Sequence, residues 1–219
     1  MNDDQRPLVI DRRMTSRGDV VLRRAGDAFE VIANGTFLMD TRDGRSERAL
    51  VAAALEGMTR PRLLLGGLGV GFSLDEALRR DVAEVVVVEV EPAVLEWAAG
   101  PLRGVVEHGL DDPRVRPVLG DLREVLAELE PPFDAVCLDV DNGPGWLVHE
   151  DNAALYGPEG LAAVARLLRP GGRLSVWSAQ PDEEFEARLR QLFRRVETIH
   201  IPVARGPDDV VYLSRTRRP

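Results

Sequence analysis

Four acidic residues stand at or just beyond the ends of apolar runs, where carboxylates can take part in chemistry. Glu89 ends EVVVVE, Asp121 follows RVRPVLG, and Asp139 ends FDAVCLD, with Asp141 two residues later. If these runs are neighbouring strands of an open α/β sheet, their ends converge on one crevice. Carboxylates there can bind ribose hydroxyls or an exocyclic amine, or accept a proton from a reacting group. The alternative for each residue is a solvated loop acid or a helix cap.

A cluster of glycines precedes Glu89. The segment RLLLGGLGVGFSLDEALRR, residues 62–80, has glycine at positions 66, 67, 69 and 71. Glycine lets backbone N–H groups approach a ligand closely, and the helical pattern that begins near Phe72 turns its positive end toward that ligand. With the following apolar run, this pattern predicts the strand, turn, helix and strand of a nucleotide-binding βαβ unit. Glu89 lies 22 residues after Gly67, about where such a fold places an acid on the ribose hydroxyls.

The glycine pattern differs from those of two related nucleotide folds. A dinucleotide GxGxxG motif that starts at Gly67 needs glycine at position 72, and one that starts at Gly66 needs it at 68, but these positions hold Phe72 and Leu68. A phosphate-binding P-loop needs a lysine, and the chain has none. What remains is GxGxG, formed by Gly67, Gly69 and Gly71, which suits a nucleoside without a pyrophosphate.

Composition limits the partners and the location. The formal net charge of −9 argues against a nucleic-acid partner and fits a cationic ligand better. No apolar run approaches the roughly 18 residues of a membrane span, and the polar N-terminus lacks a signal peptide, so we expect a cytoplasmic protein without membrane association.

The single cysteine, Cys137, excludes disulfides within the chain and a cysteine-based zinc cluster. The three histidines show no metal-ligand spacing, so no metal is expected.

The order of strand and helix patterns predicts the architecture. Their alternation from residue 62 onward predicts an α/β fold with a doubly wound, mostly parallel seven-stranded sheet. The loop ARGPDD is too short for a crossover helix, so the last two strands should be antiparallel. Residues 1–58 are expected to form a loose tail to about residue 15, a small β-hairpin around Ala33-Asn34-Gly35, and a helix capped by Asp43 or Ser46. Residues 59–219 are expected to form the nucleoside-binding domain.

The predicted element boundaries follow from these patterns. The strands are expected at 62–65, 84–89, 114–119, 133–139, 173–178, 198–203 and 209–214. The helices between them are expected at 73–80, 92–99, 122–129, 158–168 and 182–193.

Several of these segments together resemble a known superfamily. GGLGVGFSL, VVVVEVEPAVLEWA, VLGDLREVL, FDAVCLDVDNGP and LLRPGGRLSVWS are similar to motifs of class I S-adenosylmethionine-dependent transferases, and more closely of the spermidine synthase branch. The resemblance runs from about Ala33 to the end of the chain. It implies a class I methyltransferase-like Rossmann fold that binds S-adenosylmethionine or decarboxylated S-adenosylmethionine, with no metal. It also implies a set of cofactor-binding residues: Gly67, Gly69, Gly71, Glu89, Val90, Asp121 and Leu122.

The same resemblance implies roles for single residues. Glu89 would hold the ribose hydroxyls, Asp121 with Leu122 would face the adenine, and Asp139 would accept the proton of the attacking amine. Asp141 is the second catalytic candidate, and His149 is a further candidate base. Four residues are candidates for substrate contacts: Glu47, Asn142, Trp146 and Tyr156. Core packing is the alternative role for the two aromatic rings.

The chain departs from the branch where the polyamine would be held. Asn142 stands in place of a second aspartate, Leu38 in place of a glutamine, and Arg45-Ser46-Glu47 in place of Tyr-His-Glu. Because Leu38 and Ser46 offer no obvious contact for putrescine, we expect weak or absent activity with it.

The predicted function is transfer of an alkyl group to a small amine-type acceptor by a protein that is expected to be a homodimer. An alkylammonium has a pKa near 10.4, so a base such as Asp139 is needed to free the amine. The group transferred stays open between aminopropyl and methyl. The alternatives are a small-molecule methyltransferase and a non-catalytic nucleoside-binding module, while an NAD oxidoreductase is disfavoured by Phe72.

Overall fold

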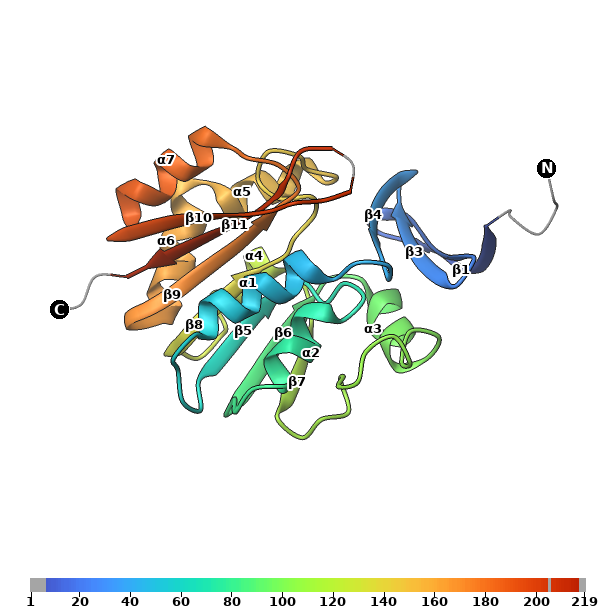
Figure 1. Cartoon of the computed structure of the whole chain (residues 1–219), viewed down its shortest axis with the longest axis horizontal. Coiled ribbons are helices and arrows are strands. Elements are labelled where there is room, and N and C mark those ends of the chain that lie inside the picture. The colour runs from blue at the N-terminus through green and yellow to red at the C-terminus, as the bar shows by residue number, and fades with distance from the viewer. Residues whose placement is uncertain (1–6, 205, 217–219) are drawn as a thin grey trace.

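Seven strands form the main sheet of the computed structural model, which describes residues 7–204 and 206–216 (Figure 1). Their order across the sheet is β10-β11-β9-β8-β5-β6-β7. Strands β5 to β9 pair in parallel, whereas β11 is antiparallel to both β9 and β10. The strands are β5 (Arg62–Gly66), β6 (Glu84–Glu89), β7 (Val115–Leu119), β8 (Phe133–Leu138), β9 (Leu168–Ser178), β10 (Arg195–Ile201) and β11 (Asp209–Arg215). The predicted seven-stranded sheet and its antiparallel last pair are confirmed.

Helices cover both faces of this sheet because successive strand residues point to opposite sides. In β5, Leu63 and Leu65 belong to one buried cluster and Leu64 to another. The first cluster includes residues of α1 (Arg45–Leu55), α2 (Phe72–Leu78) and α3 (Pro92–Ala99). The second includes residues of α4 (Leu122–Val125), α5 (Ala153–Tyr156), α6 (Pro158–Leu167) and α7 (Glu183–Leu192). Burial on both faces explains the continuous apolar runs of the central strands.

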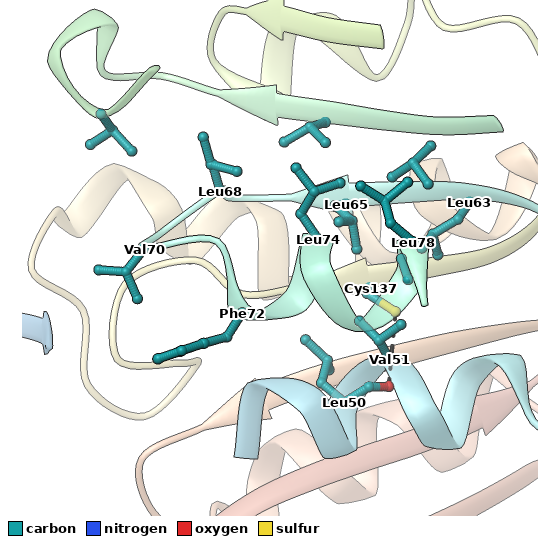
Figure 2. Close-up of a cluster of buried hydrophobic side chains, with 14 of the residues drawn as sticks. Leu50, Val51, Leu63, Leu65, Leu68, Val70, Phe72, Leu74, Leu78 and Cys137 are labelled. Carbon is teal, nitrogen blue, oxygen red and sulfur yellow. Dashed lines mark hydrogen bonds between the residues drawn. The ribbon is translucent and has the colours of Figure 1, made fainter. Parts of the chain in front are cut away.

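Cys137 lies inside the first cluster, under helix α1 (Figure 2). Its thiol lies 3.9 Å from the carbonyl oxygen of Leu50, and burial raises the pKa of the thiol. The thiolate is therefore disfavoured, and Cys137 acts as a small core residue.

The strand register brings the candidate acids to one edge of the sheet. Gly66, the last residue of β5, pairs with Val88 of β6 and with Leu138 of β8. Glu89 pairs with Leu119 at the end of β7. Since these parallel strands end at the same level, the segments that follow them converge at their carboxyl ends.

The N-terminal region forms a separate four-stranded antiparallel sheet (Figure 1). Its strands are β1 (Leu8–Thr15), β2 (Gly18–Ala25), β3 (Ala28–Ala33) and β4 (Thr36–Asp40). The predicted hairpin is confirmed as β3–β4, with φ of 51° at Asn34 and 78° at Gly35. The predicted loose tail is wrong for residues 8–15, because they form β1 and pair with β2, with a register shift between Val9 and Asp11. Strand β1 is mostly exposed and shows no apolar alternation; residues 1–6 of the tail lie outside the described residues.

Helix α1 begins differently from the prediction. Its N-cap is Gly44, and neither Asp43 nor Ser46 caps it. Asp43 instead accepts hydrogen bonds from the backbone and the guanidinium of Arg45, and the Ser46 hydroxyl donates to Glu47. The helix packs on the main sheet, since Leu50 and Val51 share a cluster with Leu63. The division of the chain at residue 58 stays a prediction.

Other boundaries shift by a few residues. The helical conformation of α4 ends at Val125 rather than at residue 129, β9 begins at Leu168 rather than at 173, and β10 runs from Arg195 to Ile201. No helix within the described ranges is long and apolar enough to cross a membrane.

Candidate active site

The glycine turn after β5 lies against the end of β8. Gly67 has a φ of +95°, and a Cβ there would lie 2.1 Å from the backbone oxygen of Asp139. Gly71 has a φ of +100° and is the N-cap of α2. Positive φ favours glycine at both positions, and the close backbone contact of Gly67 brings the turn next to Asp139.

Glu89 holds this turn in place from the end of β6. Its Oε2 accepts a hydrogen bond from the Leu68 backbone N–H at 3.0 Å, and its Oε1 accepts one from the Glu91 N–H at 2.9 Å. Burial raises the pKa of this carboxyl, and these backbone hydrogen bonds oppose that rise. Each carboxylate oxygen has a second lone pair, so Glu89 can still accept hydrogen bonds from ligand hydroxyls.

A first cavity, here called the nucleoside cavity, brings together most of the predicted cofactor-binding residues. Its lining includes Gly67, Gly69, Glu89, Val90, Asp121 and Leu122, together with both Asp139 and Asp141. Gly71 is not part of this lining and contributes by starting α2. The N-terminal sheet closes the other side with Val20, Val31, Ala33, Leu38 and Met39. The cavity therefore lies between the two sheets and has largely apolar walls.

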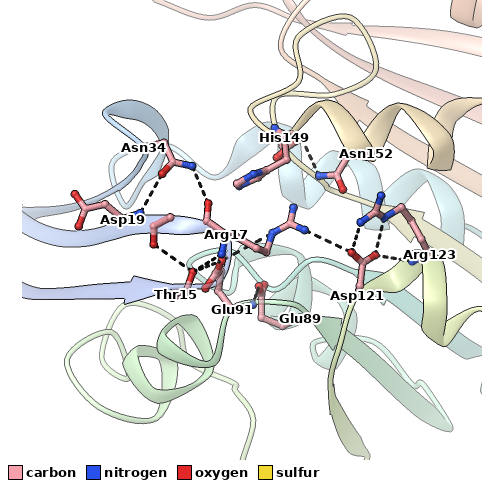
Figure 3. A network of polar contacts seen from close by, with 12 residues as sticks. Thr15, Arg17, Asp19, Asn34, Glu89, Glu91, Asp121, Arg123, His149 and Asn152 are labelled. Carbon is pink, nitrogen blue, oxygen red and sulfur yellow. Dashed lines mark hydrogen bonds and ion pairs between the residues drawn. The ribbon is translucent and has the colours of Figure 1, made fainter.

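Asp121 is already well bonded in this cavity (Figure 3). It is the N-cap of α4 and accepts from the backbone N–H and Nε of Arg123, both at 2.9 Å. Its other oxygen accepts from Arg123 Nη2 at 2.6 Å and from Arg17 at 3.4 Å. The hydrogen bonds from Arg123 lower the pKa of Asp121. An adenine amine would therefore have to share this carboxylate with two arginines.

A second cavity, here called the acceptor cavity, adjoins the first. It has a volume of about 740 Å³. Both cavities share Leu38, Met39, Gly69, Asp139 and Asp141 as lining residues, so a ligand can extend from one into the other past Asp139.

Six carboxylates line the acceptor cavity, among them Glu47 of α1, Asp139 after β8, and Asp209 at the start of β11. Within the described ranges, no arginine or histidine nitrogen lies within 4.0 Å of any of these three. The two lining arginines are engaged elsewhere, because Arg42 pairs with Asp40 and Arg45 with Asp43. The cavity lining thus holds six carboxylates against two arginines, so it concentrates negative charge.

Burial and mutual repulsion shift the pKa values of these acids. Burial, followed by the charge of Glu47, raises the pKa of Asp139 to about 8, against a hydrogen bond from the Ser73 hydroxyl at 3.4 Å. Burial likewise raises the pKa values of Glu47 and Asp209. An ionised carboxylate in such a site is stabilised by a nearby cation, so the cavity favours cationic ligands.

The remaining predicted residues lie in different surroundings. Asp141 adopts a φ of +54°, and its Oδ2 accepts from the Asn152 side chain at 2.8 Å and from the His149 N–H at 3.3 Å. Asn142 lines the acceptor cavity and is buried, and its Nδ2 has no partner among the described residues. Trp146 also lines this cavity and is 52% exposed.

Tyr156 lies in the core, away from the lining of both cavities. Its ring packs edge-on against Phe185, and its hydroxyl donates to the Val140 carbonyl at 2.7 Å. The structure therefore gives Tyr156 a packing position behind the loop that carries Asp139 and Asp141. Among the described residues, no group of three or more His, Cys, Asp or Glu side chains is placed to hold a metal ion.

Sequence reasoning missed Asp209, although a signal was present. An antiparallel strand begins at the edge where its parallel neighbours end, so the first residue of β11 falls at the same edge of the sheet as Asp139. It also missed Arg17, which reaches the nucleoside cavity from the N-terminal sheet. Nothing in the local sequence around Arg17 indicates that contact.

Comparison with known proteins identifies similar sequences. No protein-family model matches the chain. The polyamine aminopropyltransferase of Mycobacterium tuberculosis is 34% identical over 178 residues, which cover 79% of this chain and 33% of that protein. Polyamine aminopropyltransferase 1 of Streptomyces coelicolor is 32% identical over 183 residues, with the same two shares. The polyamine aminopropyltransferase of Aeropyrum pernix is 29% identical over 199 residues, covering 83% of this chain and 61% of that protein. The chain thus spans about one third of the length of the first two relatives.

Solved structures share the fold. A spermidine synthase in complex with the transition-state analogue AdoDATO superposes with a TM-score of 0.82 at 20% identity, covering 97% of this chain and 75% of that one. Spermidine synthase from Thermotoga maritima gives a TM-score of 0.78 at 20% identity, covering 97% and 74%.

The sheet order and the cavity at the strand ends place the chain in the class I S-adenosylmethionine-dependent transferase fold. Within that fold, the chain belongs to the spermidine synthase, or polyamine aminopropyltransferase, family. The resemblance predicted from the sequence motifs is confirmed.

Proposed function

We propose that this chain transfers the aminopropyl group of decarboxylated S-adenosylmethionine to an amine acceptor. The observation that carries the proposal is the continuity of two cavities past Asp139. One cavity contains the glycine turn and Glu89, and the other is lined by six carboxylates and only two arginines. A nucleoside with a cationic tail suits the first cavity, and an amine suits the second. The family of the chain supports the same reaction.

The reaction requires the amine to be aligned with the aminopropyl carbon of the donor, and it requires a proton to be removed from the amine. The neutral amine nitrogen attacks the aminopropyl carbon bonded to the sulfonium sulfur, and the C–S bond breaks. Its electron pair stays on sulfur, so 5′-methylthioadenosine leaves as a neutral thioether. The sulfonium is already an activated leaving group, so the protein mainly brings the two reactants into line. Before this attack, Asp139 takes a proton from the acceptor ammonium and so frees the neutral amine.

Asp139 is placed to take that proton because it lines both cavities. Its pKa is about 8 without a bound cation, so near pH 7 much of it is protonated. A sulfonium bound beside it favours the charged carboxylate and lowers its pKa. Donor binding therefore favours the ionised form of Asp139, which can accept a proton from the acceptor.

The charge of the acceptor cavity favours the decarboxylated donor. S-adenosylmethionine carries a carboxylate on its tail, which would meet Asp139, Glu47 and Asp209. Like charges in a partly buried site repel each other, whereas the aminopropyl tail brings only an ammonium. This argument favours aminopropyl transfer over methyl transfer.

The direct test is product analysis with the purified chain. Each donor, S-adenosylmethionine or its decarboxylated form, is incubated with a panel of mono-, di- and triamines. Mass spectrometry then measures 5′-methylthioadenosine and S-adenosylhomocysteine. We expect 5′-methylthioadenosine that depends on a diamine or triamine. S-adenosylhomocysteine would instead indicate a methyltransferase, and binding without either product would indicate a non-catalytic module. A homodimeric state and a cytoplasmic location stay predictions.

A further inference from the structure

Arg17 connects the N-terminal sheet to the nucleoside cavity (Figure 3). It lies in the turn between β1 and β2. Its backbone N–H donates to the Thr15 hydroxyl at 3.1 Å, and its carbonyl accepts from the Asn34 side chain at 3.0 Å. Asn34 belongs to the β3–β4 turn and also accepts from the Asp19 N–H at 3.0 Å. Two turns of the N-terminal sheet thus fix the backbone of Arg17, and only its side chain extends into the cavity.

The side chain of Arg17 is half-buried, and its guanidinium is poorly bonded. Its side chain is 16% exposed, and it lies 3.4 Å from Asp121 and 3.9 Å from Glu91. Its Nε has no hydrogen-bond partner among the described residues. Arg123, by contrast, approaches the same Asp121 carboxylate at 2.6 to 2.9 Å. Charge-assisted hydrogen bonds normally lie near 2.7–2.9 Å, so Arg17 retains donor capacity on the cavity side.

The neighbouring acid is also incompletely bonded. Glu91 is 8% exposed; its Oε1 accepts from the Thr15 hydroxyl at 3.3 Å, and its Oε2 has no partner among the described residues. Glu91 and Asp121 hold the guanidinium at the cavity wall without satisfying it. A buried donor without a partner is unfavourable, so a ligand that offers an acceptor at this point gains affinity.

An adenine ring offers acceptors of this kind. Its ring nitrogens N1, N3 and N7 only accept hydrogen bonds, so the carboxylates of Glu89, Glu91 and Asp121 cannot bind them. Two other side-chain donors near this end are engaged, since Arg123 is bonded to Asp121 and the Asn152 amide to Asp141. Arg17 is therefore a positively charged side chain with unused N–H groups that can donate to a ring nitrogen.

We propose that Arg17 is a nucleoside-binding residue supplied by the N-terminal sheet, with its guanidinium donating to a ring nitrogen of the adenine. This inference rests on the proposed nucleoside-binding function. It gives the N-terminal sheet a second role besides closing the cavity, because the sheet then contributes directly to recognition of the base.

The first test compares affinities for 5′-methylthioadenosine by calorimetry. Arg17→Met keeps the length of the side chain but removes its donors and its charge. Arg12→Met is the matched control, because it removes one charge from the exposed strand β1 of the same sheet. We expect Arg17→Met to bind roughly ten- to a hundredfold more weakly, the usual worth of a hydrogen bond to a charged group, and Arg12→Met to bind like the wild type.

The outcomes separate this inference from the proposed function. A wild-type chain that binds no 5′-methylthioadenosine contradicts the proposed function itself. A wild-type chain that binds it, with Arg17→Met binding equally well, overturns only the role of Arg17. Tighter binding by Arg17→Met also overturns it, because the side chain would then block the cavity.

A second test distinguishes a direct contact from a structural effect on the sheet. The 1-deaza, 3-deaza and 7-deaza analogues of 5′-methylthioadenosine each lack one ring acceptor. We expect one analogue to bind the wild type about tenfold more weakly than the parent nucleoside, and that difference to vanish in Arg17→Met. If every analogue shows the same loss in both proteins, Arg17 does not contact the ring.

Discussion

The backbone N–H of Leu68 donates to Oε2 of Glu89 at 3.0 Å, so the acid after β6 holds the glycine turn after β5. The residue expected to bind the ribose therefore also shapes the cavity around it. Removing its carboxylate affects both tasks, whereas replacing it with an amide keeps an oxygen that can still accept from Leu68. This difference makes the two roles of Glu89 separable by mutation.

Glu89→Ala should weaken binding of 5′-methylthioadenosine by about a hundredfold or more. The reason is the loss of charge-assisted hydrogen bonds to ribose hydroxyls, each worth roughly 1.5–3 kcal/mol. Glu89→Gln should lose less, because its amide oxygen still accepts hydrogen bonds. Calorimetry on both variants measures the effect. Unchanged affinity in Glu89→Ala would exclude this cavity as the nucleoside site.

Asp209→Asn should weaken binding of a diamine acceptor more than that of a monoamine. Asp209 lies in the acceptor cavity with Glu47 and Asp139, where it can hold the second ammonium of a longer acceptor. Loss of this charge-assisted contact should raise the KM for 1,4-diaminobutane roughly tenfold and leave donor affinity unchanged. Asp208→Asn is the matched control, since Asp208 lies outside the lining of that cavity and is 45% exposed on its side chain. Equal effects of the two substitutions would remove Asp209 from acceptor binding.

This result would also revise an expectation based on the sequence. From Leu38 and Ser46 we expected weak binding of putrescine. That expectation considered only the positions at which the spermidine synthase branch contacts the polyamine. The structure adds Asp209, which comes from a strand more than 160 residues along the chain from Leu38. The Asp209→Asn variant measures whether this acid supports activity with a diamine.

Much of the fold was predictable because strong local signals agreed with one another. The alternation of apolar runs and glycines predicted β5, α2 and β6 closely, since buried parallel strands require continuous apolar residues. Strand β1 was not predictable in this way. Its residues LVIDRRMT are largely exposed and show no alternation of apolar and polar side chains. Their extended conformation depends on their pairing with β2.

The site was predictable only where residues follow strand ends. Glu89, Asp121 and Asp139 were expected to share one cavity because a parallel sheet brings such ends together, and all three line the nucleoside cavity. Arg17 depends on how the N-terminal sheet packs over that edge, and Tyr156 turns into the core through its hydroxyl bond to Val140. Packing between two sheets is a tertiary effect that no local spacing encodes.

Asp75→Asn should strongly destabilise the protein. Asp75 in α2 is fully buried and accepts from Arg48 at 2.6 Å, from Arg79 at 3.1 Å, and from the backbone and ring of His108. Breaking a buried charged network typically costs about 3–5 kcal/mol, and partial exposure of the two arginines places the estimate near 3 kcal/mol. Urea unfolding at pH 7 measures the loss. Glu107→Gln is the control, since its exposed pair with Arg79 should contribute below about 1 kcal/mol.

The same network sets a dependence on pH. The Arg48 and His108 contacts outweigh burial and lower the pKa of Asp75 to about 2, below its value of about 3.9 in an unfolded chain. Ionised Asp75 therefore favours the folded state fully above about pH 4, and this contribution is lost as the pH falls through 2. The difference in unfolding free energy between the wild type and Asp75→Asn should shrink over that range.

Asp139→Asn should stabilise the protein at alkaline pH. Burial raises the pKa of Asp139 to about 8 in the folded state, so the unfolded chain ionises first as the pH rises above about 4. The wild type loses stability from this group between about pH 4 and pH 8, and the asparagine variant does not. Thermal unfolding should show the variant more stable at pH 8, by up to about 5 kcal/mol for a rise in pKa from about 4 to about 8, and nearly equal at pH 4. A variant less stable at pH 8 would contradict the assigned pKa shift.

Asp139→Asn should also separate binding from turnover. The amide keeps the size of the side chain but cannot take a proton, so affinity for the nucleoside should change little. Turnover with an amine should fall by about 10² to 10⁴, the usual worth of a general base.

In the wild type, kcat/KM should rise with pH through about 8, since the free protein must lose the Asp139 proton. The variant should not show this rise in its pH profile. Single-turnover kinetics with saturating donor provide the measurement, and a variant within a few-fold of the wild type would shift the base role to Asp141 or His149.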